Sequence, residues 1–203
     1  MMKLLCLLVL IHATLQVDVL PTSTKMLGNV SYNPGDHMPF CRFYPLFKPS
    51  NFDSISTFVD LVAYQGLWYG AANKRDPNHN CACAEATYTY SNPLWYRFTN
   101  TCRIPGMPPA TISGTGVVLD FKTNSKHILK FDVSMFAIGH YWILHYDEDH
   151  KMVLIGEPCK NSMFIISRDP KPARELVQEK LDIARAMGYV FEDSDIIWRS
   201  DKC

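Results

Sequence analysis

The sequence predicts an all-β protein, an antiparallel barrel or sandwich followed by one helix. Eight short runs rich in aromatic and β-branched residues follow one another between residues 65 and 168. Turn residues separate these runs at intervals of about 8–12 residues, which is typical of antiparallel β folds. A sustained helical period follows the last run, which predicts one helix after the strands.

The alternation of residue types is clearest in the run from Cys83 to Tyr90, where small and aromatic residues share one face and polar residues the other. Ser91-Asn92-Pro93 forms a turn, so this run and the next are expected to pair as a hairpin. The eight expected strands cover residues 68–73, 83–90, 94–102, 112–119, 127–133, 141–145, 152–155 and 163–167.

The helix is expected between Pro172, in its first turn, and Gly188, just beyond its end. Apolar residues recur at intervals of three or four positions and form one stripe: Ala173, Leu176, Val177, Leu181, Ala184 and Met187. Such a stripe docks on an apolar surface, most simply the outside of the sheet. A short final strand is expected at residues 196–198.

Composition limits the partners. The 203 residues contain 20 Lys and Arg and 20 Asp and Glu, so the formal charge is zero, and 47% are hydrophobic. This length favours one domain, and the apolar content suffices for a core. A neutral chain has no long-range field that attracts nucleic acid, which is therefore not an expected partner.

The N-terminus resembles a secretory signal. Lys3 precedes the apolar run 4–11, which is too short to span a bilayer, and no later segment reads as transmembrane. We expect a signal peptide over residues 1–20 and a secreted, extracellular protein. Residues 21–57 are rich in Pro and predict an extended arm with a glycosylation sequon at Asn29. The globular domain then covers residues 58–203.

Cysteine usage agrees with secretion. Seven cysteines are present, and the six beyond the signal predict three disulfides. Six cysteines allow 15 connectivities, so spacing alone does not choose among them. Cys81-Ala82-Cys83 lacks the second cysteine pair that is usual in zinc sites, so we expect no metal and no other cofactor.

Three patches, in order, resemble the lipocalin family. Gln65-Gly66-Leu67-Trp68-Tyr69 is similar to the motif that opens the family's first strand. Residues 141–147 resemble its sixth strand, and Ile165-Ile166-Ser167-Arg168-Asp169-Pro170 resembles its eighth. Within the family the chain looks closest to the apolipoprotein D, bilin-binding and bacterial lipocalin group. The resemblance implies an eight-stranded antiparallel up-and-down barrel with the C-terminal helix packed outside.

The resemblance also implies structural roles. Trp68 and Arg168, with Gly66, would close one end of the barrel through a cation–π contact and guanidinium hydrogen bonds to carbonyls. Cysteine positions in the apolipoprotein D-like pattern map to three disulfides. The pairs are Cys41–Cys159, Cys83–Cys203 and Cys81–Cys102, with an exchange of Cys81 and Cys83 left open.

Alternate residues of barrel strands face the interior. With Trp68 and Arg168 inward, and the hairpin phased by its match to the family, the interior is expected to be apolar with a few hydroxyl and amide groups. The expected lumen residues are Ala72, Tyr88, Tyr90, Tyr96, Phe98, Asn100, Leu129, Phe131, Val133 and Phe164.

The resemblance and this interior predict a secreted carrier of a small hydrophobic ligand, such as a fatty acid, sterol, retinoid, carotenoid or bilin. The alternatives are a lipocalin-fold enzyme, of the lipid isomerase or de-epoxidase type, and a ligand-sequestering defence or pigment protein. No catalytic residue is predicted: no known catalytic motif occurs, and His145 beside Tyr146 is a weak acid–base candidate. Four apolar residues, Met135-Phe136-Ala137-Ile138, predict either a contact with a lipid particle or receptor or a loop that folds under itself.

Overall fold

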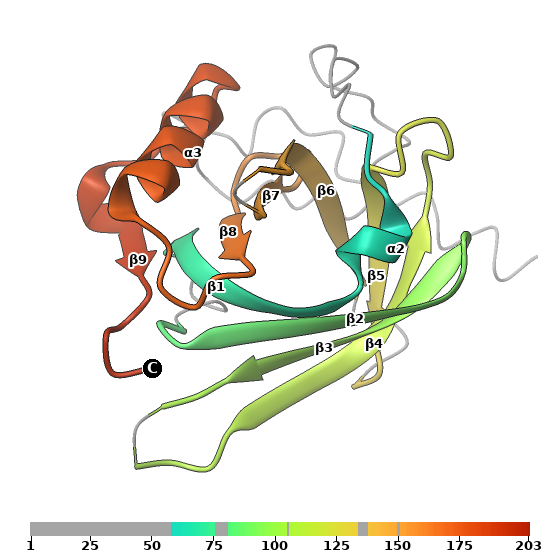
Figure 1. The fold of residues 1–203 in the computed structure, drawn as a ribbon, viewed down its shortest axis with the longest axis horizontal. Helices are drawn as coiled ribbons and strands as arrows, with labels where there is room; N and C mark the ends of the chain where they lie inside the picture. Colours follow the sequence, from blue (N-terminus) through green and yellow to red (C-terminus); the bar gives the residue numbers. More distant parts are fainter. Residues whose placement is uncertain (1–57, 76–80, 105, 134–137, 150) are drawn as a thin grey trace, which may run out of the picture. The chain divides into compact units, whose positions relative to one another are not determined.

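The computed structural model describes residues 58–75, 81–104, 106–133, 138–149 and 151–203. Within these ranges the chain forms a nine-stranded antiparallel sheet in the order β2-β3-β4-β5-β6-β7-β8-β1-β9. Because β1 also pairs with β2, the first eight strands close into a barrel, and β9 extends the sheet from β1 outside it (Figure 1). The predicted eight-stranded barrel is confirmed.

Each strand from β1 to β8 pairs with its neighbours in the chain, and β9 pairs with β1. The strands are β1 (Gly66–Lys74), β2 (Ala84–Asn92), β3 (Trp95–Cys102), β4 (Ala110–Val118), β5 (Lys126–Phe131), β6 (Ile138–Asp147), β7 (Met152–Gly156), β8 (Met163–Ser167) and β9 (Ile196–Trp198). Between β1 and β8 the connections join antiparallel neighbours, so turn chemistry helps to define the register of each pair. At the β2–β3 turn, for example, the Asn92 side-chain oxygen accepts hydrogen bonds from the backbone N–H groups of Leu94 and Trp95.

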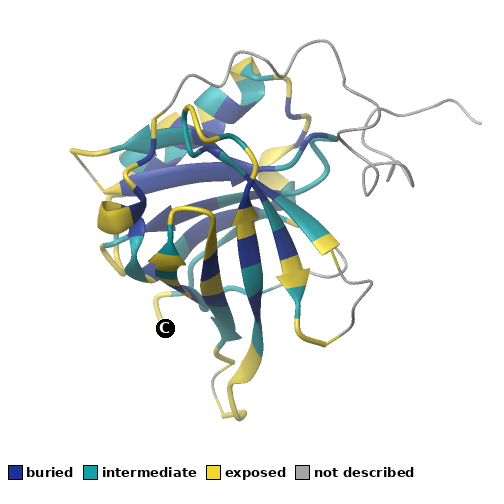
Figure 2. Ribbon diagram, turned by 90° about the vertical axis from the view of Figure 1, so that its right-hand side faces the viewer, coloured by how far each residue is buried: buried dark blue, intermediate teal, exposed yellow. Residues whose placement is uncertain are grey.

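Two apolar clusters lie on opposite sides of the barrel wall. The inner cluster collects inward-facing residues such as Trp68, Tyr88 and Phe98, and the outer cluster packs residues such as Leu154 beneath the C-terminal helix. Strands with an apolar layer on both faces read as continuous hydrophobic runs, as β7 does, and all five of its residues are buried. Figure 2 shows buried residues along the strands and exposed residues at the turns.

Helix α3 (Arg174–Ala186) buries Val177, Leu181 and Ala184 against the outer cluster, as its stripe predicts. It ends before Gly188, whose φ of +85° belongs to the left-handed region that favours glycine. Lys180 is also buried on this face, and its Nζ lies 2.7 Å from a carboxylate oxygen of Asp147. This ion pair ties the helix to the end of β6.

Most strand boundaries differ from the expected ones by one or two residues, and one of these differences changes an expected site residue. β5 ends at Phe131, two residues earlier than predicted, and Val133 is 72% exposed, so its expected place in the lumen is wrong. The Asp132 N–H still donates to the Ser113 carbonyl of β4, but residues 132 and 133 form a turn, so the alternation of the strand ends before Val133. β6 begins at Ile138, three residues earlier than predicted.

Several predictions lie outside the described residues: the signal peptide, the arm with Asn29, Cys41, and residues 135–137 of the apolar loop. Of that loop only Ile138 is described, at 44% exposure. Within the described ranges, no helix is long and apolar enough to cross a membrane. The same ranges contain no cluster of residues suited to hold a metal ion.

Candidate ligand-binding site

One end of the barrel is sealed around Trp68. Its ring is fully buried, and its Nε1–H donates to the Tyr64 carbonyl at 2.8 Å. The Arg168 guanidinium lies 3.9 Å from the ring centroid and donates to the carbonyl of Leu67 at 2.6 Å. It also donates to the carbonyls of Ala63 and Gln65. These bonds and the cation–π contact place Arg168 beneath the tryptophan as the closed end of the barrel.

Gly66 allows this arrangement. Its φ is +94°, a left-handed conformation that side chains rarely adopt, and a Cβ atom there would lie 3.3 Å from an Arg168 Nη1. The structure therefore brings together Gly66, Trp68 and Arg168, the three residues expected to close the barrel.

Three buried tyrosines above Trp68 form a chain of hydrogen-bonded hydroxyl groups. The sequence predicted only one of them, Tyr88, as an inward-facing residue. The Tyr141 hydroxyl donates to Tyr88 at 2.9 Å and lies 2.6 Å from the Tyr64 hydroxyl. Since Tyr141 has one proton and gives it to Tyr88, Tyr64 is the donor to Tyr141. Burial raises the pKa of all three hydroxyls, so they remain neutral. Tyr64 comes from the short helix α2 (Leu61–Tyr64), which Asp60 caps.

His127 lies beside these tyrosines at the closed end, which is called the floor below. The sequence did not predict it as an inward-facing residue. Its Nδ1 accepts the Tyr96 hydroxyl at 2.9 Å, and its Nε2 lies 2.9 Å from the Asn124 carbonyl oxygen. Nε2 therefore carries the proton of a neutral imidazole. Burial lowers the pKa of His127 to about 4. Its ring stacks on Tyr141, with centroids 5.9 Å apart.

On the inner wall of the barrel, between its closed end and its open end (the mouth), aromatic rings of β3 lie opposite glycines of β4. Tyr96 of β3 lies opposite Gly116 of β4, and Phe98 lies opposite Gly114. A Cβ at Gly116 would come within 2.1 Å of the Tyr96 ring, and one at Gly114 within 2.6 Å of the Phe98 ring. The rings therefore lie against the neighbouring strand, in space that any larger residue on β4 would occupy.

Inward-facing side chains in the other half of the barrel are less covered. Phe131 and Phe164 pack against the inner cluster yet are only partly buried. Asn100, which follows Phe98 inward by alternation on β3, is also half-buried. The Asn100 Oδ1 has no hydrogen-bond partner among the described residues. This half, referred to below as the open half, combines apolar rings with an unpaired amide oxygen.

A family model described as a lipocalin-like domain matches residues 59–200, which is most of the chain. The protein belongs to the lipocalin family. A curated relative, temperature-induced lipocalin-1 of Arabidopsis thaliana, is 28% identical over 139 residues, which cover 64% of this chain and 74% of the plant protein.

Solved structures show the same fold. Insecticyanin from the tobacco hornworm Manduca sexta has a TM-score of 0.55 and 17% identity, over 71% of this chain and 82% of the other. Lobster apocrustacyanin A1 has a TM-score of 0.54 and 14% identity, over the same shares of the two chains. At sequence identities this low, the comparison shows the barrel fold alone. The binding site has to be inferred from this lipocalin's own residues.

Most predicted lumen residues lie in the inner cluster or pack against it: Tyr88, Tyr90, Tyr96, Phe98, Leu129, Phe131 and Phe164. Ala72 does not, and that prediction is wrong. A β-bulge between Gly70 and Ala72 shifts the register, so Gly70 pairs with the inward-facing Ile166 but Ala72 pairs with the outward-facing Ile165. The extra residue of a bulge reverses the alternation beyond it, and Ala72 packs beneath the helix.

The same bulge turns Asn73 inward. Asn73 pairs with Phe164 of β8, which faces the inner cluster, and is 8% exposed. Its Nδ2 donates to the Lys74 carbonyl at 3.3 Å. Unbroken alternation in the sequence assigns Asn73 to the outer face, so only the bulge reveals it as a polar group of the open half.

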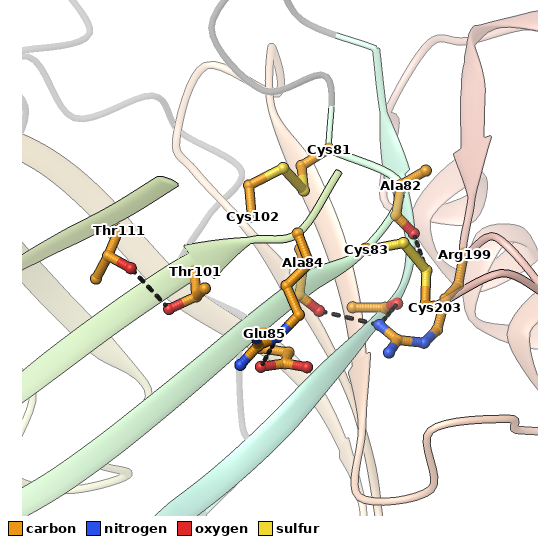
Figure 3. The surroundings of a disulfide bond; sticks show 12 residues. Cys81, Ala82, Cys83, Ala84, Glu85, Thr101, Cys102, Thr111, Arg199 and Cys203 are labelled. Carbon is orange, nitrogen blue, oxygen red and sulfur yellow. Dashed lines mark hydrogen bonds and ion pairs between the residues drawn. A yellow bond between two sulfur atoms is a disulfide. The ribbon is translucent and has the colours of Figure 1, made fainter. Parts of the chain in front are cut away.

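Two disulfides fasten the edge of this half (Figure 3). Cys81 bonds to Cys102 and Cys83 to Cys203, which is the expected pairing rather than its exchanged form. Cys159 is disulfide-bonded as well, while its expected partner Cys41 lies outside the described residues.

The C-terminal tail fills the place where β1 and β2 diverge. The Arg199 backbone N–H donates to the Ala71 carbonyl at 2.9 Å, and its guanidinium donates to the Ala84 carbonyl at 3.1 Å. The Ser200 N–H bonds to the Ala82 carbonyl at 3.0 Å. The Cys83–Cys203 bond therefore holds a tail that bridges the two strands near the mouth.

The candidate groups for catalysis are not arranged for it. A bulge in β6 pairs His145 with the outward-facing Leu154 and Tyr146 with the inward-facing Val153, so the two candidates lie on opposite faces of the wall. Every described cysteine is disulfide-bonded, which leaves no thiolate nucleophile in that part of the chain.

Proposed function

We propose that this lipocalin is a secreted carrier that binds a small hydrophobic ligand in the open half of its barrel. One observation carries the proposal: inward-facing apolar side chains there, such as Phe131 and Phe164, retain contact with solvent, whereas Trp68 and Tyr96 at the floor are fully buried. Apolar surface that faces the inside of a closed barrel and still meets water is surface that a ligand can cover.

The expected affinity follows from the apolar surface area that the ligand buries. A ligand that removes roughly 300 Å² of apolar surface from water gains about 7 kcal/mol at 25 cal/mol per Å². This corresponds to a dissociation constant in the micromolar range. The two disulfides at the edge of the open half add to the affinity because they order this edge before binding.

Secretion is supported by two features of the chain. The apolar run behind Lys3 has the length of a signal peptide. All five described cysteines are in disulfides, which form and persist in oxidising compartments. Expression of the full chain in a secretory host, followed by N-terminal sequencing of the medium protein, tests this. We expect a new N-terminus near residue 20, and retention of the intact chain inside cells would contradict the proposal.

Ligand binding is tested by titration with the neutral fluorescent probe N-phenyl-1-naphthylamine. We expect saturable binding at one site with a micromolar dissociation constant. Ile112→Trp places a large ring in the open half, since Ile112 pairs with the inward-facing Asn100. It should weaken binding at least about tenfold.

Thr111→Trp is the matched control, because Thr111 is exposed on the outer face of the same strand. Its affinity should equal that of the wild type. Unchanged binding by a folded Ile112→Trp variant would place the probe elsewhere and overturn the proposed site.

A further inference from the structure

We propose that the ligand is uncharged and carries a hydroxyl group, as sterols and retinoid alcohols do, so that the barrel discriminates against anions such as fatty acids. This inference rests on the proposed function and defines its ligand class. It follows from the charges of the inner wall, from the polar atoms that face the ligand, and from the placement of the nearest cation.

The inner wall has no charged side chain within the described residues. Charged residues of the strands alternate to the outer face, where Glu85 pairs with Arg103 at 2.9 Å and Arg97 pairs with Asp132. Lys126 is outside as well, 5.2 Å from the centroid of the outward-facing Trp142 ring. The inward neighbours of these positions are apolar, aromatic or amide residues.

The cation nearest the floor is not available to a ligand. Arg168 lies on the far side of the fully buried Trp68 ring, and its N–H groups are directed to three backbone carbonyls. His127 does not supply a positive charge, because both ring nitrogens are hydrogen-bonded as the neutral form requires and its pKa is lowered to about 4 by burial. A carboxylate in the barrel would lose water without gaining a cation.

An unpaired polar atom inside the barrel favours a ligand that carries a hydroxyl group. The Asn100 Oδ1 is buried and has no partner among the described residues, and as an acceptor it requires a ligand that donates a proton. An alcohol O–H can donate to this oxygen, whereas an ionised carboxylate has no proton to donate and leaves the oxygen unpaired.

The test compares two probes of equal chain length, dodecan-1-ol and dodecanoic acid. Each competes with N-phenyl-1-naphthylamine at pH 8, where the acid is ionised. We expect the alcohol to bind at least about tenfold more tightly. Asn100→Leu, which keeps the volume and removes the acceptor, should weaken the alcohol several-fold while the neutral reporter binds as before.

Thr99→Leu, on the adjacent outward position of β3, is the matched control and should change neither affinity. Equal or tighter binding of the acid by the wild type overturns the inference alone, and so does an Asn100→Leu variant that binds the alcohol with wild-type affinity. If the reporter itself does not bind to the folded protein, the proposed function fails, and the inference fails with it.

Discussion

The closed end and the open half of this barrel are built from inward-facing residues of the same strands, but they differ in how their polar atoms are partnered. At the closed end the hydroxyls of Tyr64, Tyr88 and Tyr141 bond to one another, and His127 bonds at both nitrogens. In the open half the Asn100 Oδ1 lacks a partner among the described residues.

This difference separates stability from binding. A buried polar atom with a protein partner contributes to a unique folded state, whereas one without a partner costs free energy until a ligand supplies the bond. The floor is therefore expected to hold the fold, and the open half to hold the ligand. Substitutions at the floor should lower stability more than ligand binding, and substitutions in the open half should lower ligand binding more than stability.

The largest effect is expected for Trp68→Ala. Removing a fully buried tryptophan leaves a cavity and deprives Arg168 of its stacking partner, so the free energy of unfolding should fall by about 3–5 kcal/mol. Phe131→Ala, in the half-buried wall, should lose only about 1–2 kcal/mol but should weaken probe binding. Urea denaturation and probe titration measure the two quantities. Equal stability losses at the two positions would remove the distinction between floor and open half.

A pH-dependent effect of up to about 3 kcal/mol is expected from His127. Its pKa is about 4 in the folded protein, because burial disfavours the charged ring, and about 6.5 in an unfolded chain. Between these values the unfolded state binds more protons, so stability is fully present above pH 6.5 and is lost as the pH falls toward 4.

Urea denaturation at pH 7.5 and pH 5 tests this in the wild type and in His127→Gln. The variant should lose less stability between the two pH values than the wild type does. An identical pH dependence in both proteins would show that His127 is not held neutral by the floor.

The smallest effect concerns the wall between the two regions. Gly116→Ala forces a methyl group against the buried Tyr96 ring, at 2.1 Å before relaxation, and should cost about 1–3 kcal/mol. Gly139→Ala in the open half meets the Phe131 ring at 3.3 Å and should cost less than about 1 kcal/mol. Thermal unfolding ranks the two variants, and the reverse order would mean that the Tyr96 ring moves freely toward the lumen.

Local patterns in the sequence were sufficient for the strands and the amphipathic helix. Alternation depends on the two-residue period of a strand, and the helical stripe on its 3.6-residue period, so both can be read from neighbouring residues. The resemblance to lipocalins added Trp68, Arg168 and the pairing of Cys81 with Cys102 and of Cys83 with Cys203.

The tertiary structure decided which residues meet across the barrel. The bulge after Gly70 moved Ala72 out and Asn73 in, and the turn after Phe131 left Val133 exposed. Tyr64 and Tyr141 are 77 positions apart, yet their hydroxyls lie 2.6 Å from each other. A periodic pattern carries no information about a single inserted residue or about contacts between distant strands, because both depend on how the sheet closes on itself.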